Sequence, residues 1–197
     1  MKKLKGLLDL EGNNSLIGQV FDHEIDLNDF NINPISIPGA FKDFSFVPGK
    51  KGFSLIEYAE KFENYLNSLN VASTQISPLV SGVMEAIKNA YEHGNIKDNS
   101  KKIFWHNYLS KEKVFESIVG DVGGKINGNF FSYSLNLREK KKTNINDAIG
   151  FYQFINQTFS PYGHSGVGLK DIHKSFDSVR YFKNKFGGLS LYMKRNL

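Results

Sequence analysis

The chain changes its pattern near residue 100, and this change constrains the fold more than any other feature. Before it, apolar residues recur at intervals of three and four over residues 54–70 and again from about 77 to 92, which predicts two amphipathic helices. After it, residues 101–110 and 113–121 are rich in β-branched and aromatic residues, and they predict a hairpin. Helices followed by strands favour an α+β fold, a two-layer sandwich of a mixed, mostly antiparallel sheet with helices on one face.

Further elements are expected on both sides of this core. They are a short strand at 43–49, a strand at 129–137, a helix at 145–159, a long helix at 169–186 and a final strand at 187–197. Residues 1–42 are rich in Asn, Asp and Gly, and we interpret them as an N-terminal extension with at most one hairpin, within residues 12–27. The domain itself is then expected to span residues 43–197.

The ends of the first two helices carry recognisable signals. Ser54 is expected to be the N-cap of the first helix, with Glu57 three residues later completing a capping box. Pro78 suits the first turn of the second helix, because proline has no N–H to leave unpaired there. Gly94 is expected to be the C-terminal cap of that helix.

Composition excludes several classes of protein. The chain has 197 residues, 40% of them hydrophobic and 23% charged, as is typical of a globular domain. It has no cysteine, which excludes disulfides and thiolate metal sites and makes a cytoplasmic location the expectation. No run approaches the roughly 20 apolar residues of a membrane span, and no signal peptide is evident. The net charge of +5 would favour anionic partners, although we interpret the one dense basic cluster, residues 138–144, as a solvated loop.

The second helix carries an unusual polar stripe. Glu85, Asn89 and His93 follow each other at steps of four residues, which places them on one helix face. The apolar residues occupy the opposite face, so a carboxylate, an amide and an imidazole are left to face something other than the core. The remaining histidines are scattered, and a zinc site is therefore not expected.

Two glycine-rich stretches follow. Asp121 stands at the end of a predicted strand, directly before Val122, Gly123 and Gly124. Farther along, Gly163, Gly166 and Gly168 precede the helix predicted at 169–186. Glycines at a helix N-terminus let backbone N–H groups approach a phosphate. Each stretch alone is weak evidence, since such loops are commonly plain turns.

The order of these features resembles the GHKL ATP-binding fold of histidine kinases, gyrase-type topoisomerases, Hsp90 chaperones and MutL. Within that superfamily, the segment EAIKNAYEHGN (85–95) is most similar to the N box of the anti-sigma factor serine/threonine kinases. The later Gly-x-Gly-Leu (166–169), the helix after it and the Gly-Gly before the last strand match the same family. The resemblance covers residues 43–197 and leaves the first 42 outside.

The resemblance implies a role for each matched residue. Asn89 would bind the Mg²⁺ that accompanies ATP, and Glu85 would be the general base for phosphate transfer. Asp121 would accept a hydrogen bond from the adenine amino group, beside Gly123 and Gly124, and His93 would make a contact at the helix end. The last group would donate backbone N–H groups to the phosphates; it comprises Gly163, Gly166, Val167, Gly168 and Leu169.

The chain departs from the family at the first glycine box. Lys125 stands where the last glycine of the Asp-x-Gly-x-Gly pattern is expected, which leaves open whether it contacts a phosphate or alters the hinge of the ATP lid at 126–162. An alternative alignment would move the adenine site beyond residues 129–137, where no Asp-Gly remains. Asp121 is preferred because two strands then separate it from the N box, as in the family.

Several functions remain open at this point. The first is an ATP-dependent kinase that phosphorylates a small, anti-anti-sigma-like regulatory protein and also binds a sigma-like client. The second is a nucleotide-binding regulatory module without phosphate transfer. A detached histidine-kinase domain and a basic nucleic-acid-binding protein rank below both, and no membrane partner is expected. A homodimer is compatible with either leading function.

Overall fold

The structure is a computed structural model that describes residues 24–26, 36–123, 125–127 and 167–197. Its helices are α1 (Leu55–Ser68), α2 (Ser73–Asn89) and α5 (Val167–Ser175), with a 3-10 turn at Gly49–Lys51 and a π-helical turn at Ala90–Gly94. Its strands are β1 (Glu24–Asp26), β2 (Lys42–Asp43), β3 (Phe104–Leu109), β4 (Val114–Gly120), β5 (Lys125–Asn127), β6 (Ser178–Lys183) and β7 (Leu189–Asn196). The predicted elements at 129–137 and 145–159, and most of 12–27, lie outside these residues.

Five of the strands form one open sheet in the order β2-β3-β4-β7-β6, and β1 pairs separately with β5. All pairings among the described strands are antiparallel, where the sequence predicted a mixed sheet. Tight connections explain much of this, since short turns join β3 to β4 and β6 to β7, and a short turn can only join antiparallel neighbours. The hairpin predicted at 101–121 is confirmed, with Phe104 opposite Gly120 and Leu109 opposite Phe115.

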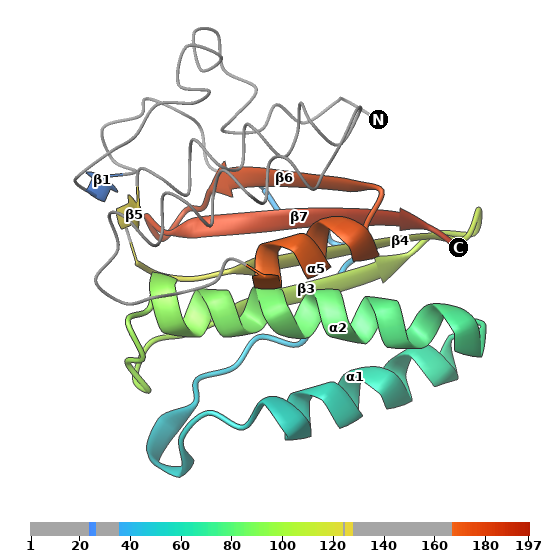
Figure 1. Cartoon of the computed structure of the whole chain (residues 1–197), viewed down its shortest axis with the longest axis horizontal. Coiled ribbons are helices and arrows are strands. Elements are labelled where there is room, and N and C mark those ends of the chain that lie inside the picture. The colour runs from blue at the N-terminus through green and yellow to red at the C-terminus, as the bar shows by residue number, and fades with distance from the viewer. Residues whose placement is uncertain (1–23, 27–35, 124, 128–166) are drawn as a thin grey trace, which may run out of the picture.

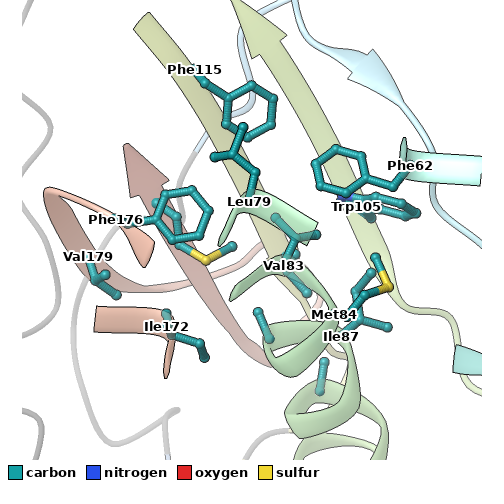
Figure 2. Close-up of a cluster of buried hydrophobic side chains, with 14 of the residues drawn as sticks. Phe62, Leu79, Val83, Met84, Ile87, Trp105, Phe115, Ile172, Phe176 and Val179 are labelled. Atoms are coloured by element: carbon teal, nitrogen blue, oxygen red, sulfur yellow. The ribbon is translucent and has the colours of Figure 1, made fainter. Parts of the chain in front are cut away.

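Three helices cover one face of the sheet (Figure 1). Strand residues that alternate toward the helices, such as Trp105, Phe115 and Met193, are fully or almost fully buried against them. Figure 2 shows this core, in which Leu79 and Val83 of α2 lie among side chains from the sheet and from α1 and α5. The α+β class is therefore confirmed, with α2 as its central helix.

The other face of the sheet has a small apolar cluster of its own. Ile118 and Phe182 are buried there, and Ile37 and Phe41 pack against them. The Phe41 ring also stacks on Tyr108, with ring centroids 5.5 Å apart. Residues just before the predicted domain boundary at 43 thus contact the sheet.

The ends of the helices differ from the prediction. Ser54 is the N-cap of α1, but its side chain caps no backbone N–H, so the predicted capping box is wrong. Helix α2 begins at Ser73, four residues earlier than expected, and Pro78 lies inside it. Proline at that position leaves the carbonyl of Thr74 without its helical partner, and Thr74 is exposed, so water can hydrate the carbonyl.

The end of α2 is also different. Gly94 lies inside the π turn and has no positive φ; the left-handed residues are Ile96 (φ 55°) and Lys97 (φ 57°). The turn is closed by the Asn95 N–H, which donates to the Ala90 carbonyl at 2.8 Å. The prediction of Gly94 as a left-handed cap is therefore wrong, and its lack of a side chain has another reason, given below.

The predicted long helix at 169–186 is half helix and half strand. Helix α5 ends at Ser175, and β6 follows from Ser178. The apolar spacing of Ile172, Phe176 and Val179 fits a helix, but Val179 and Tyr181 both belong to the core beneath the helices, while Phe182 belongs to the cluster on the other face. A spacing of two residues is typical of a strand, and it describes the second half of the segment, β6.

Candidate functional site

Asp121 directly follows β4 and is only 6% exposed. Its carboxylate oxygen Oδ1 accepts two backbone N–H bonds, from Gly123 at 2.9 Å and from Leu189 at 3.2 Å. Within the described part of the chain, Oδ2 accepts no hydrogen bond. One oxygen thus orients the carboxylate, and the other lies against Gly94.

Three glycines stand directly against this carboxylate. A Cβ added at Gly94, at Gly123 or at Gly188 would overlap Asp121 atoms or come within 3.1 Å of them. A Cβ at Gly123 would also overlap the carbonyl oxygen of Gly94. The end of α2, the loop after β4 and the β6–β7 turn therefore meet at Asp121, and each meets it with a residue that lacks a side chain.

Burial raises the pKa of Asp121 to about 6, while the N–H bonds from Leu189 and Gly123 and the charge of Lys101 act in the opposite direction. An ordinary aspartate in water titrates near pH 3.8. Desolvation thus outweighs the hydrogen bonds at this site. The carboxylate is held in surroundings that disfavour its charge.

Glu85 meets the first turn of α5. A Cβ added at Gly168 would overlap the Glu85 carboxylate, so the two groups are in contact. Helices α2 and α5 also cross closely at Gly82, where a Cβ would lie 2.7 Å from Phe176 and from Ser175. The helix that carries the N box and the glycine-led helix α5 therefore come together, as the sequence predicted (Figure 1).

Burial raises the pKa of Glu85, Lys88 lowers it, and the charges of Asp171 and Glu92 raise it further. The Lys88 ammonium lies 3.9 Å from Glu85 Oε2 and is itself partly exposed, so it screens the carboxylate only weakly. A carboxylate with a raised pKa is a stronger base than an ordinary one, and this property suits a general base.

The predicted stripe on α2 extends into the π turn that follows the helix. Glu85 and Asn89 lie one α-helical turn apart, and both are half-buried. His93 lies in the π turn and is exposed. The expectation that these three residues face one ligand stays a prediction.

The side chain of Asn89 has the chemistry of a magnesium ligand. Mg²⁺ prefers oxygen ligands and usually takes only one or two from the protein, with phosphates and water completing its shell. The Asn89 amide offers one such oxygen, one turn after Glu85. Across the described ranges, no group of three or more His, Asp or Glu side chains is arranged to hold a metal.

Not every predicted residue can be placed. Gly124, Gly163 and Gly166 lie outside the described residues. The backbones of Lys125 and Val167 are described, in β5 and at the start of α5. Leu169 is buried in the core, so only its backbone N–H is available at the start of α5.

Three residues were missed by the sequence reasoning. In the sequence Gly188 stands out only as part of a Gly-Gly pair, and Asn95 only as the last residue of the N box. Asn184 had no signal of its own, beyond being an asparagine four residues before a glycine in a turn. All three contact Asp121 or the loop that follows it.

Comparisons with known proteins add no family. No protein-family model matches the chain, and no curated protein resembles it closely enough to count as a match. None of the helices in the described residues is sufficiently long and apolar to span a bilayer.

Proposed function

We propose that this protein binds ATP in the manner of the GHKL fold, as an anti-sigma-type serine/threonine kinase that transfers the γ-phosphate to a small regulatory protein. The observation that carries the proposal is the pair of contacts along α2. Gly94 meets the Asp121 carboxylate, and Glu85 meets the first turn of α5. The Glu85 contact lies on α2 and the Gly94 contact in the π turn that follows it, so they are about two helical turns apart, roughly 11 Å at about 5.4 Å per turn, as an elongated ligand with two different ends requires.

At one end, Asp121 receives the base. Its Oδ1 is already engaged by two N–H groups, so Oδ2 accepts from the ligand. The exocyclic amino group of adenine is a suitable donor, whereas guanine presents a carbonyl oxygen at that edge. The buried acceptor therefore favours adenine, because an unpaired carboxylate oxygen facing a carbonyl is unfavourable.

At the other end, the start of α5 receives the phosphates. The first four N–H groups of a helix have no partner within the helix, and those of Gly168 and Leu169 are among them in α5. These donors and the helix dipole favour a phosphate. Asn89 would hold a Mg²⁺, which would neutralise phosphate charge.

Glu85 acts on the acceptor hydroxyl. Its carboxylate takes the proton of a serine or threonine as the hydroxyl oxygen bonds to the γ-phosphorus. The bond between the γ-phosphorus and the bridging oxygen breaks, and ADP leaves. A positioned base contributes about 10²- to 10⁴-fold to the rate of such a step, and the remaining acceleration comes from positioning and charge neutralisation.

A nucleotide-binding module without transfer is the second candidate. It is favoured by Lys125, which begins a strand paired with Asp26 where the family pattern has the last glycine of the box. With a strand at that point, the chain leaves the Asp121 loop along a different path from the one that the family pattern implies. This difference would alter how the protein closes over the phosphates and would leave nucleotide binding intact.

Glu85→Gln separates the two candidates. It should keep ATP affinity within a few-fold and reduce phosphate transfer by at least about 100-fold, because the amide cannot take a proton. Binding is measured by the rise in Tm with Mg·ATP, and transfer by labelled phosphate on candidate small-protein substrates. Glu63→Gln, an exposed glutamate of α1, is the control.

Two results would redirect the proposal. If wild type and Glu85→Gln form ADP at the same rate, the kinase is abandoned and the binding module is kept. If saturating Mg·ATP leaves the Tm of wild type unchanged, ATP binding itself is wrong.

A further inference from the structure

Asn95 is the residue that joins the end of α2 to the Asp121 loop. It is 0% exposed, and both ends of its side chain are engaged. Its Oδ1 accepts the N–H of Val122 at 3.0 Å, and its Nδ2 donates to the carbonyl of Lys102 at 3.1 Å. Its backbone N–H closes the π turn. One asparagine thus connects the π turn, the residue after Asp121 and the segment that leads into β3.

Asn184 connects the Asp121 loop to the β6–β7 turn in a similar way. It is 5% exposed, and its Nδ2 donates to the carbonyl of Asp121 at 2.8 Å. Its Oδ1 accepts the N–H of Phe186 at 2.9 Å and that of Gly188 at 3.1 Å. The β6–β7 turn, which presents Gly188 to the carboxylate, is therefore tied to the backbone of Asp121 itself.

Together the two asparagines leave the Asp121 loop little freedom. The two buried amides hold the same planar peptide group, the one between Asp121 and Val122: Asn184 holds its carbonyl and Asn95 holds its N–H. Losing either bond would leave a buried backbone group unpaired, which costs about 1–3 kcal/mol unless the loop moves to recover a partner. A loop that moves takes the direction of the carboxylate with it.

We propose that Asn95 and Asn184 are positioning residues that aim Asp121 Oδ2 and thereby set the preference of the site for adenine over guanine. This inference rests on the proposed function, since it concerns the base that the site selects. A hydrogen-bonding site rejects the wrong partner only while its groups are held in place. Neither asparagine needs to touch the ligand.

The test compares Asn95→Ala and Asn184→Ala with Asn107→Ala. Asn107 is an equally buried asparagine whose Oδ1 accepts from Trp105 Nε1 at 3.1 Å, and it contacts no part of the Asp121 loop. Affinities for Mg·ATP and Mg·GTP are measured by calorimetry, and exchange of the Val122 backbone amide is measured by NMR without nucleotide.

The expected result is a loss of discrimination. Asn95→Ala and Asn184→Ala should lower the ratio of ATP to GTP affinity at least ten-fold, and Asn95→Ala should speed exchange at Val122 at least ten-fold. Asn107→Ala should keep the wild-type ratio even if its Tm falls. If Asn95→Ala does not fold, Asn184→Ala carries the test alone, because it removes the donor to the Asp121 carbonyl and leaves Asn95 in place.

The outcomes separate the two proposals. An unchanged ratio in both alanine variants, with wild type preferring ATP, would overturn this inference and leave the proposed function standing. An equal fall in the ratio for Asn107→Ala would overturn it too, because general destabilisation would then explain the effect. A wild type that binds neither nucleotide would overturn the proposed function and this inference together.

Discussion

The surroundings of Asp121 in the folded protein disfavour the charged form of its carboxylate. Two N–H bonds to Oδ1 do not compensate for its removal from water, as its raised pKa indicates. Such a group is retained where a ligand completes it, and it otherwise lowers the stability of the free protein.

Replacing Asp121 by asparagine should make this cost measurable. The pKa of Asp121 is about 6 in the folded state and near 3.8 in the unfolded state, so the folded state holds the proton more tightly. Its contribution to stability is complete below about pH 4 and is lost as the pH rises through 6. The free energy of unfolding of Asp121→Asn minus that of wild type should therefore rise by up to roughly 3 kcal/mol between pH 4 and pH 7.

Urea unfolding of both proteins at several pH values checks this difference. Asparagine keeps the oxygen that accepts from Gly123 and Leu189, so the comparison isolates the charge. Parallel stability profiles for the two proteins would show that the Asp121 carboxylate is not desolvated in the free protein.

Gly94 allows a second test at a single residue. Because its φ is not positive, alanine there strains no backbone, and any effect comes from the overlap of the new Cβ with the Asp121 carboxylate. Gly94→Ala should weaken Mg·ATP binding at least ten-fold, as measured by calorimetry. Gly39→Ala is the control, since a Cβ at Gly39 meets nothing within 4 Å. Unchanged affinity in Gly94→Ala would mean that Asp121 does not face the ligand.

At the scale of elements, the contact between α2 and α5 holds the two halves of the proposed phosphate site together. The helices approach each other closely at two points, and at each point one helix contributes a glycine: Gly82 on α2 and Gly168 on α5. Closely packed interiors tolerate added atoms poorly. The spacing of the two helices is therefore sensitive to single methyl groups.

A double-mutant cycle tests this contact. Gly168→Ala should destabilise the protein by about 0.5–1.5 kcal/mol, because the new Cβ overlaps the carboxylate and Cγ of Glu85 and forces that flexible side chain away from its rotamer. Glu85→Ala removes all of the overlapped atoms, so the double variant should recover most of that loss. Chemical denaturation of the four proteins provides the coupling energy. Strictly additive effects would place Gly168 away from Glu85.

The sequence pattern predicted those elements whose hydrogen bonds and side-chain periodicity lie within one short stretch of the chain. Helix α1 was predicted from its apolar periodicity, and the β3–β4 hairpin from two β-rich runs separated by a turn. The resemblance led us to expect the N box and Gly168 at one site. Prediction failed where tertiary context decides. The segment after Ser175 becomes a strand because β7 offers it a partner along its length, from Ser178 opposite Lys194 to Lys183 opposite Leu189.

The sequence predicted only part of the proposed site, namely the residues that are recognisable by their own chemistry. Glu85 and Asp121 have a side-chain chemistry that marks them in the sequence. Gly188 and Asn184 act through close approach and backbone hydrogen bonds across 63 residues or more, which no short window of sequence contains. Asn95 lay inside the recognised motif, but its partner Val122 became evident only in the fold.

At the scale of the whole molecule, strand order places β7 between β4 and β6. Each of its residues from Ser190 to Lys194 is opposite a residue of both neighbours, whereas β2 is a two-residue strand at the edge. The sheet that supports the site therefore depends on β7 more than on any edge strand.

Proline substitutions should reveal this difference. Leu191→Pro removes a ladder N–H in the central strand, between Val119 and Tyr181, and should abolish cooperative unfolding. Lys42→Pro in β2 should leave a cooperative transition with a lower midpoint. Circular dichroism during thermal unfolding distinguishes them. Equal losses in the two variants would contradict the strand order.

The central position of β7 also bears on how the protein is made. Among the described strands β7 is synthesised last, so on the ribosome β3 and β4 are complete while one long edge of β4 still lacks its partner. Unpaired strand edges invite association with other chains. Gly188 and the Leu189 N–H that orients Asp121 emerge at the same late moment. A nascent chain therefore completes the proposed nucleotide site only when the edge of β4 is covered, and a ligand of that site cannot help it fold before then.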